Sequence, residues 1–126
     1  AFMERLYPLR HNYGLMQGKP GGAIVTCAIP EDCPGLPNAC QNGIEAIQNY
    51  MMEEGMNFQG GVKILGNVPC LTCGYGEECA ISGLKMIFGP EASLDSVNLT
   101  SFENQDQAFR EVEELGANIR TALLGG

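Results

Sequence analysis

An uninterrupted apolar run over residues 22–29 constrains this chain more than any other feature, because glycine and proline bound it and no polar alternation interrupts it. That pattern is typical of a strand buried on both faces, as in a parallel sheet. A second strand, with glycines near its middle, is expected over residues 56–65. Between the two strands, Ile44, Ile47 and Met51 recur at helical spacing. The sequence therefore predicts a strand–helix–strand unit with parallel strands.

The ends of the helices also carry local signals. Asn38 can cap the helix between the strands, and Gly55 lies where a left-handed C-terminal residue belongs. Asn104 is predicted to cap a last helix with one apolar stripe. The stripe consists of Phe109, Val112, Leu115, Ile119 and Leu123. Residues 1–7 are predicted to be helical up to Pro8. A long irregular loop is expected over residues 66–99, with weak helical character only over 82–88.

Composition narrows the class of protein. The 126 residues are 44% hydrophobic, which is enough for the core of one domain and excludes disorder. Fifteen acidic residues against seven basic ones give a net charge of -8, which disfavours nucleic acid as a partner. No apolar run approaches the ~20 residues of a membrane span, so no membrane partner is expected.

Six cysteines in a short chain could form disulfides, but most of them lie outside the predicted elements and the apolar content suffices without them. We therefore expect reduced thiols and a cytoplasmic protein.

The predicted sheet is incomplete. Parallel strands need cover on both faces, and two strands with two or three helices supply little of it. The chain also starts within a predicted helix and without Met, as a fragment would. We expect residues 1–126 to form a single, partial domain whose sheet is completed by an upstream part of the protein or by a second copy.

Several segments, taken in order, resemble the C-terminal half of a known family. They are residues 1–5 (AFMER), 21–26 (GGAIVT), 43–47 (GIEAI) and 54–56 (EGM), followed by the last helix. This order resembles the flavodoxin-like, NAD(P)H-dependent FMN reductases, a group that includes the iron–sulfur flavoproteins. The resemblance implies an α/β, flavodoxin-like fold with a three-layer parallel sheet, of which this chain supplies the C-terminal part.

The resemblance also implies a function. It is that of an FMN-dependent oxidoreductase, which takes electrons from NAD(P)H and passes them to a quinone, a free flavin or an iron–sulfur partner, commonly as a homo-oligomer. The Ser/Thr/Gly-rich loop that binds the FMN phosphate in this family has no counterpart here, so the chain alone is expected to bind FMN weakly or not at all.

Ligands of this architecture lie beyond the carboxyl ends of the strands. The residues predicted to line an isoalloxazine ring there are Thr26, Cys27, Ala28, Ile29 and Pro30. The alternative for Cys27 is that it simply ends a buried strand as a small apolar residue.

A second chemistry is suggested by Cys70, Cys73 and Cys79, three thiols within ten residues. A C-x-x-C turn can direct both sulfurs toward one zinc ion or one iron–sulfur cluster. The fourth ligand would come from another cysteine or another chain. A non-catalytic metal or iron–sulfur binding module is thus the alternative function, and a C-x-x-C disulfide or free thiols are the simpler interpretations. The residue sets that hydrolases need are absent from the sequence.

Overall fold

The computed structural model describes residues 13–125, and the helix predicted over residues 1–7 lies outside them. Strand β1 (Pro20–Cys27) and strand β2 (Asn57–Leu65) form a two-stranded sheet and flank helix α2 (Ala39–Glu53) in the sequence. The strands are parallel, with Pro20 opposite Asn57 and Cys27 opposite Leu65. The predicted strand–helix–strand unit is confirmed, although β1 begins and ends two residues earlier than the apolar run.

Helix α2 begins and ends as its local sequence predicts. The side-chain Oδ1 of Asn38 accepts a hydrogen bond from the backbone N–H of Gln41. After the helix, Gly55 adopts a φ of 72°, a left-handed conformation that costs other residues steric strain. The inner face of α2 buries Cys40 and Ile44.

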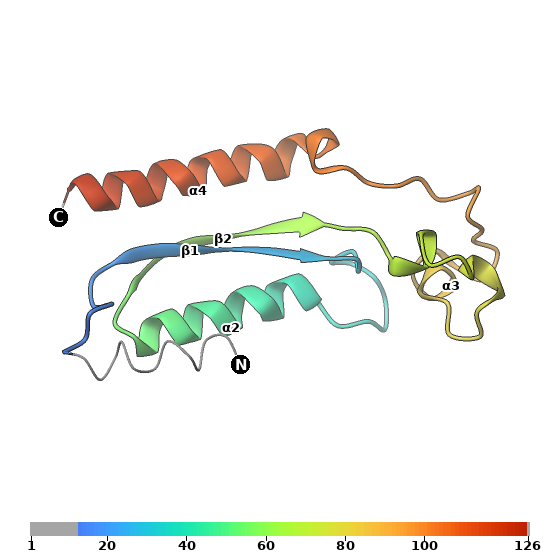
Figure 1. The fold of residues 1–126 in the computed structure, drawn as a ribbon, viewed down its shortest axis with the longest axis horizontal. Coiled ribbons are helices and arrows are strands. Elements are labelled where there is room, and N and C mark those ends of the chain that lie inside the picture. Colours follow the sequence, from blue (N-terminus) through green and yellow to red (C-terminus); the bar gives the residue numbers. More distant parts are fainter. Residues whose placement is uncertain (1–12, 126) are drawn as a thin grey trace.

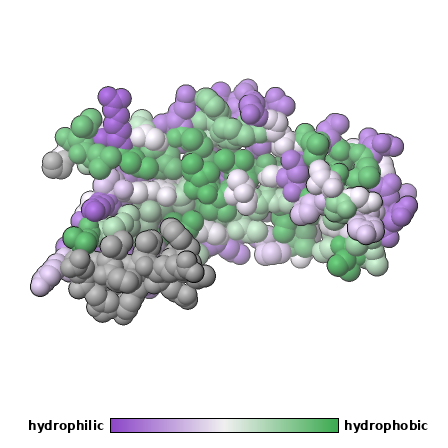
Figure 2. Space-filling model, in the orientation of Figure 1, coloured by the Kyte–Doolittle hydropathy of each residue, from purple (hydrophilic) through white to green (hydrophobic). Residues whose placement is uncertain are grey.

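Helix α4 (Asp106–Leu124) lies on the face of the sheet opposite to α2 (Figure 1). Leu115 of α4 packs where a side chain at Gly22 would stand, and α2 brings Gly43 against Val25 on the other face. The two strands thus have a helix on each side. The cover is incomplete, because the side chain of Ile24 stays 53% exposed. Figure 2 shows hydrophobic surface along α4 and the neighbouring sheet.

Asn104 does not cap α4, contrary to the prediction. It belongs to a 3-10 turn (Phe102–Asn104), and α4 begins at Asp106 without a side-chain cap. Gln105, the residue just before α4, bonds instead to the end of β2. Its amide accepts a hydrogen bond from the Leu65 N–H and donates one to the Leu65 carbonyl, so it satisfies the backbone at the end of β2. The prediction failed because the residue that organises this helix start contacts a strand 40 residues away.

Residues 66–99 are more ordered than expected. They hold two 3-10 turns (Pro69–Leu71 and Gly76–Glu78) and helix α3 (Gly83–Phe88), the last close to the helical stretch predicted over 82–88. Val68, Leu84 and Ala92 form a small core, in which Leu84 has no exposed surface. The segment therefore folds around apolar contacts of its own, beyond the carboxyl ends of the strands (Figure 1).

Candidate functional site

A cavity of about 740 Å³ opens where the carboxyl ends of β1 and β2 meet the start of α4. Its walls come from the two strands, the segment after β1, the first turn of α2 and the first turns of α4. The lining residues are Cys27, Ile29, Pro30, Glu31, Cys40, Gly61, Lys63, Ile64, Leu65, Gln105, Asp106, Gln107, Ala108 and Glu111. This is the edge at which open parallel sheets bind their ligands.

The cavity contains part of the predicted ligand site. Cys27, Ile29 and Pro30 line it, whereas Thr26 and Ala28 do not. Thr26 is exposed, and as a strand residue it faces away from the side that Cys27 faces. Ala28 instead packs against the small core of the 66–99 segment. The prediction took five consecutive residues. Because successive side chains along an extended backbone point to different sides, only some of the five can face the cavity.

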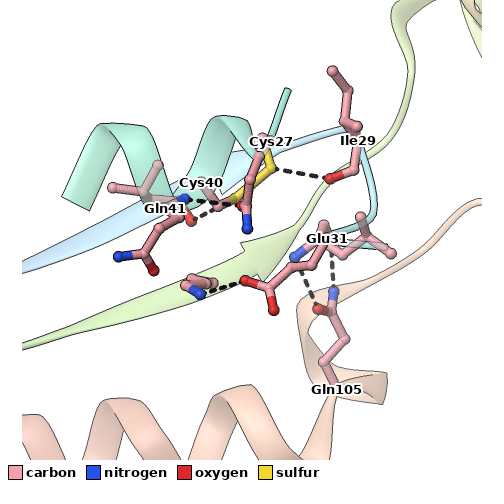
Figure 3. The surroundings of a disulfide bond; sticks show 10 residues. Cys27, Ile29, Glu31, Cys40, Gln41 and Gln105 are labelled. Carbon is pink, nitrogen blue, oxygen red and sulfur yellow. Dashed lines mark hydrogen bonds and ion pairs between the residues drawn. A yellow bond between two sulfur atoms is a disulfide. The ribbon is translucent and has the colours of Figure 1, made fainter. Parts of the chain in front are cut away.

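Charged and amide groups on the wall were not predicted. Glu31 forms an ion pair with Lys63, which joins the segment after β1 to strand β2. Gln105 lies beside them with its amide bonded to Leu65 (Figure 3). Glu31 directly follows the predicted run, so position alone could have indicated it. Lys63 and Gln105 enter through the pairing of β2 and the packing of α4, for which the sequence holds no local signal.

Acidic groups outnumber basic ones around the cavity. Within the part of the chain that the structure describes, the wall carries the carboxylates of Glu31, Asp106 and Glu111 and one ammonium group, that of Lys63. Because Glu31 already pairs with Lys63, the remaining field at the α4 side is negative. These side-chain charges favour neutral or cationic ligand groups over anionic ones, while the uncapped N–H groups at the start of α4 act in the opposite sense.

Cys27 and Cys40 form a disulfide on the cavity wall (Figure 3). The expectation that the thiols are reduced is wrong for this pair. The end of β1 meets the first turn of α2 with the two Cα atoms 5.8 Å apart, a separation that suits a disulfide. Thirteen positions separate the two cysteines, and only the fold of the intervening loop brings them together.

The cysteines of the 66–99 segment are free thiols in different settings. Cys70 is half-buried, and its Sγ accepts a hydrogen bond from the Gly83 N–H at 3.2 Å. The backbone N–H groups of Gly83 and, next, Leu84 hold the pKa of the Cys70 thiol below its usual value. Cys73 is exposed, and the Tyr75 N–H points to its Sγ at 3.5 Å.

These thiols do not converge on one point. Over residues 13–125, no group of three or more His, Cys, Asp or Glu side chains lies in position to hold a metal ion. Cys70, Cys73 and Cys79 therefore do not form a three-ligand metal site in this structure. Binding of zinc or an iron–sulfur cluster by these residues stays a prediction.

No protein-family model, no curated protein and no solved structure matches this chain. The resemblance to the flavin reductases thus rests on the segments named above. Within residues 13–125, no helix is long and apolar enough to cross a membrane.

Proposed function

We propose that this chain contributes the ring-binding part of an FMN-dependent oxidoreductase site, which takes electrons from NAD(P)H and passes them to a small-molecule or protein acceptor. The observation that supports the proposal is the cavity at the carboxyl ends of the two parallel strands, lined by Cys27, Ile29 and Pro30. Three of the five residues that the family resemblance implies thus line a cavity at the edge where this architecture binds ligands. When bound, the flavin would supply the hydride and electron transfer.

The cavity fits the ring part of a flavin. A volume of about 740 Å³ falls within the range of small-molecule sites. Ile29, Pro30 and Leu65 offer an apolar wall for a flat ring, which would exclude water from its face. The polar groups beside that wall are already engaged: Lys63 pairs with Glu31, and the Gln105 amide donates to the Leu65 and Ser101 carbonyl oxygens. The apolar wall therefore carries the fit to the ring.

The phosphate of FMN does not fit this wall. Among residues 13–125, the cation on this wall is Lys63, which is paired with Glu31, while the carboxylates of Asp106 and Glu111 repel a phosphate. In the proposed site these residues hold the ring, and they contribute nothing to binding of the phosphate.

Two further parts of the proposal come from the sequence analysis. The protein acts in the cytoplasm, although the Cys27–Cys40 disulfide removes part of the thiol argument for that location. An upstream part of the protein or a second copy completes the sheet. The exposed side chain of Ile24 is the observation on this chain that favours such cover.

Flavin titration tests the proposal. We expect riboflavin, which lacks the phosphate, to bind at least as tightly as FMN, with the dissociation constants read from quenching of flavin fluorescence. Ile29→Asp should weaken riboflavin binding about tenfold or more, because it places a further carboxylate on the apolar wall.

Ile81→Asp is the matched control, because Ile81 is exposed and is not part of the cavity wall. It should leave the dissociation constant unchanged. Absence of quenching with both flavins, or equal weakening by the two substitutions, would contradict the proposed site.

A further inference from the structure

The disulfide between Cys27 and Cys40 joins a reachable sulfur to a buried one. Cys27 ends β1 and is only partly buried, on the wall of an open cavity. Cys40 is 3% exposed and is the second residue of α2. A reagent in the cavity thus meets Cys27 first. Because thiol–disulfide exchange needs access to the attacked sulfur, the two ends of this bond are not equivalent.

The surroundings also suit the reduced pair. Cys27 Sγ lies 3.3 Å from the carbonyl oxygen of Ile29, and Cys40 Sγ lies 3.7 Å from that of Val25. A disulfide sulfur has no hydrogen to donate, whereas a thiol does. After reduction, each thiol would therefore find a carbonyl oxygen ready to accept its S–H hydrogen bond. The strand would not have to rearrange to provide these partners.

Opposing effects act on Cys40 as the leaving thiolate. A thiolate in the first turn of a helix is stabilised by the free backbone N–H groups there and by the positive end of the helix dipole. The first turn of α2 contains no acidic residue to oppose this effect. Burial of Cys40, at 3% exposure, and the Val25 carbonyl oxygen near its Sγ disfavour the same thiolate, so access to Cys27, and not the helix start, sets which sulfur is attacked.

We propose that the Cys27–Cys40 disulfide is a reversible two-electron couple, opened from the cavity by a thiol reductant that attacks Cys27. The accessible sulfur of Cys27 and the acceptors that both thiols would find carry this inference. It does not rest on the flavin proposal, because the reductant is a thiol and no flavin takes part.

With a dithiol as reductant, the exchange has two steps. A thiolate of the dithiol attacks Cys27 Sγ, a mixed disulfide forms, and Cys40 leaves as a thiolate that takes up a proton. The second thiol of the same reductant molecule, as its thiolate, then attacks the reductant's sulfur in the mixed disulfide. This step releases Cys27 as a thiolate, which takes up a proton. Two electrons and two protons have moved to the protein, and the dithiol has become a cyclic disulfide.

The first experiment equilibrates the native full chain with mixtures of reduced and oxidised dithiothreitol. Free thiols are then blocked with N-ethylmaleimide, and the peptides are analysed by mass spectrometry. We expect Cys27 and Cys40 to become labelled together, at one ratio of the reagents, while circular dichroism stays native. Reversal on return to oxidised reagent should be complete. Opening that requires denaturant would overturn the proposal.

The second experiment identifies the attacked sulfur with single variants and oxidised glutathione. In Cys40→Ser, the remaining Cys27 should form a mixed disulfide with glutathione at least about tenfold faster than Cys40 does in Cys27→Ser. Equal rates, or faster reaction of Cys40, would contradict the assignment. Cys33→Ser is the control: Cys33 is a free thiol that does not line the cavity, and its loss should leave the opening of the disulfide unchanged.

Discussion

Cys70 is a thiol whose pKa the fold lowers. Its Sγ accepts a hydrogen bond from the Gly83 N–H at the start of α3, and this contact favours the thiolate. A lowered pKa means that the thiolate persists to lower pH than in an ordinary cysteine. Because only the thiolate is alkylated, the reactivity of Cys70 reports directly on this contact.

We therefore predict that alkylation of Cys70 by iodoacetamide reaches half its maximal rate at a lower pH in the native protein than in the denatured chain. Peptide mass spectrometry across a pH series measures the rate at this cysteine alone. Gly83→Pro removes the donor, and proline is tolerated at the first position of a helix. It should shift the profile back to higher pH.

Gly83→Ala is the matched variant for that measurement. It keeps the N–H, and its Cβ would make only ordinary contacts, 3.7 Å from Cys70 Sγ at the nearest. The profile should stay at the native position. Equal profiles in the proline and alanine variants would show that the Gly83 N–H does not set the ionisation of Cys70.

At the scale of elements, one side chain joins the end of β2 to the start of α4. Gln105 bonds both the N–H and the carbonyl of Leu65, at 3.2 and 2.9 Å. We predict that Gln105→Ala lowers the free energy of unfolding by about 1–2 kcal/mol, because two backbone groups lose their partner. Urea denaturation followed by circular dichroism measures the change.

Gln107→Ala provides the comparison. Gln107 makes one exposed hydrogen bond, to Glu111 within α4, so its loss should cost no more than about 0.5 kcal/mol. If the two alanine variants lose the same stability, Gln105 does not hold β2 to α4.

Substitution by alanine is expected to have opposite effects on stability at two glycines, Gly61 and Gly116. A Cβ at Gly61 of β2 would lie 2.6 Å from Cγ2 of Ile44, so α2 can approach the sheet only because no side chain stands there. Gly61→Ala should therefore destabilise the protein by about 1–3 kcal/mol. Gly116 of α4 has open space around its Cβ position, and alanine there should stabilise the helix by up to about 1 kcal/mol.

Thermal unfolding of the two alanine variants tests this pair. The midpoint should fall for Gly61→Ala and rise for Gly116→Ala relative to the parent protein. A rise for both would mean that the contact between α2 and β2 is looser than the structure shows.

On the scale of the whole molecule, the disulfide closes the loop that connects the sheet to α2. Replacing both Cys27 and Cys40 by serine should lower the free energy of unfolding by about 3 kcal/mol, the amount expected from a loop of this length. Denaturation under oxidising conditions measures the loss. Cys33→Ser, within the same loop, should change stability by less than about 0.5 kcal/mol. Equal stability of the double variant and the parent would mean that the loop is held without the bond.

The elements of the fold were largely predictable, because their signals are local. The apolar run that became β1, the helical spacing of Ile44 and Ile47, and the residues at the ends of α2 each act within a few positions of the chain. The failures arose where a distant contact decided the outcome. Asn104 lost its role at the start of α4 because Gln105 bonds to Leu65, and residues 66–99 fold around Leu84.

The sequence by itself therefore determined that this chain forms two parallel strands joined through a helix, since hydrophobic burial and helix capping depend on neighbouring residues. The tertiary structure alone decided which cysteines pair and what the cavity contains. Cys27 and Cys40 meet, and Lys63 and Gln105 join the same wall, because the strand ends and two helix starts come together in space. Such contacts depend on packing between segments far apart in the chain, and no short stretch of sequence records them.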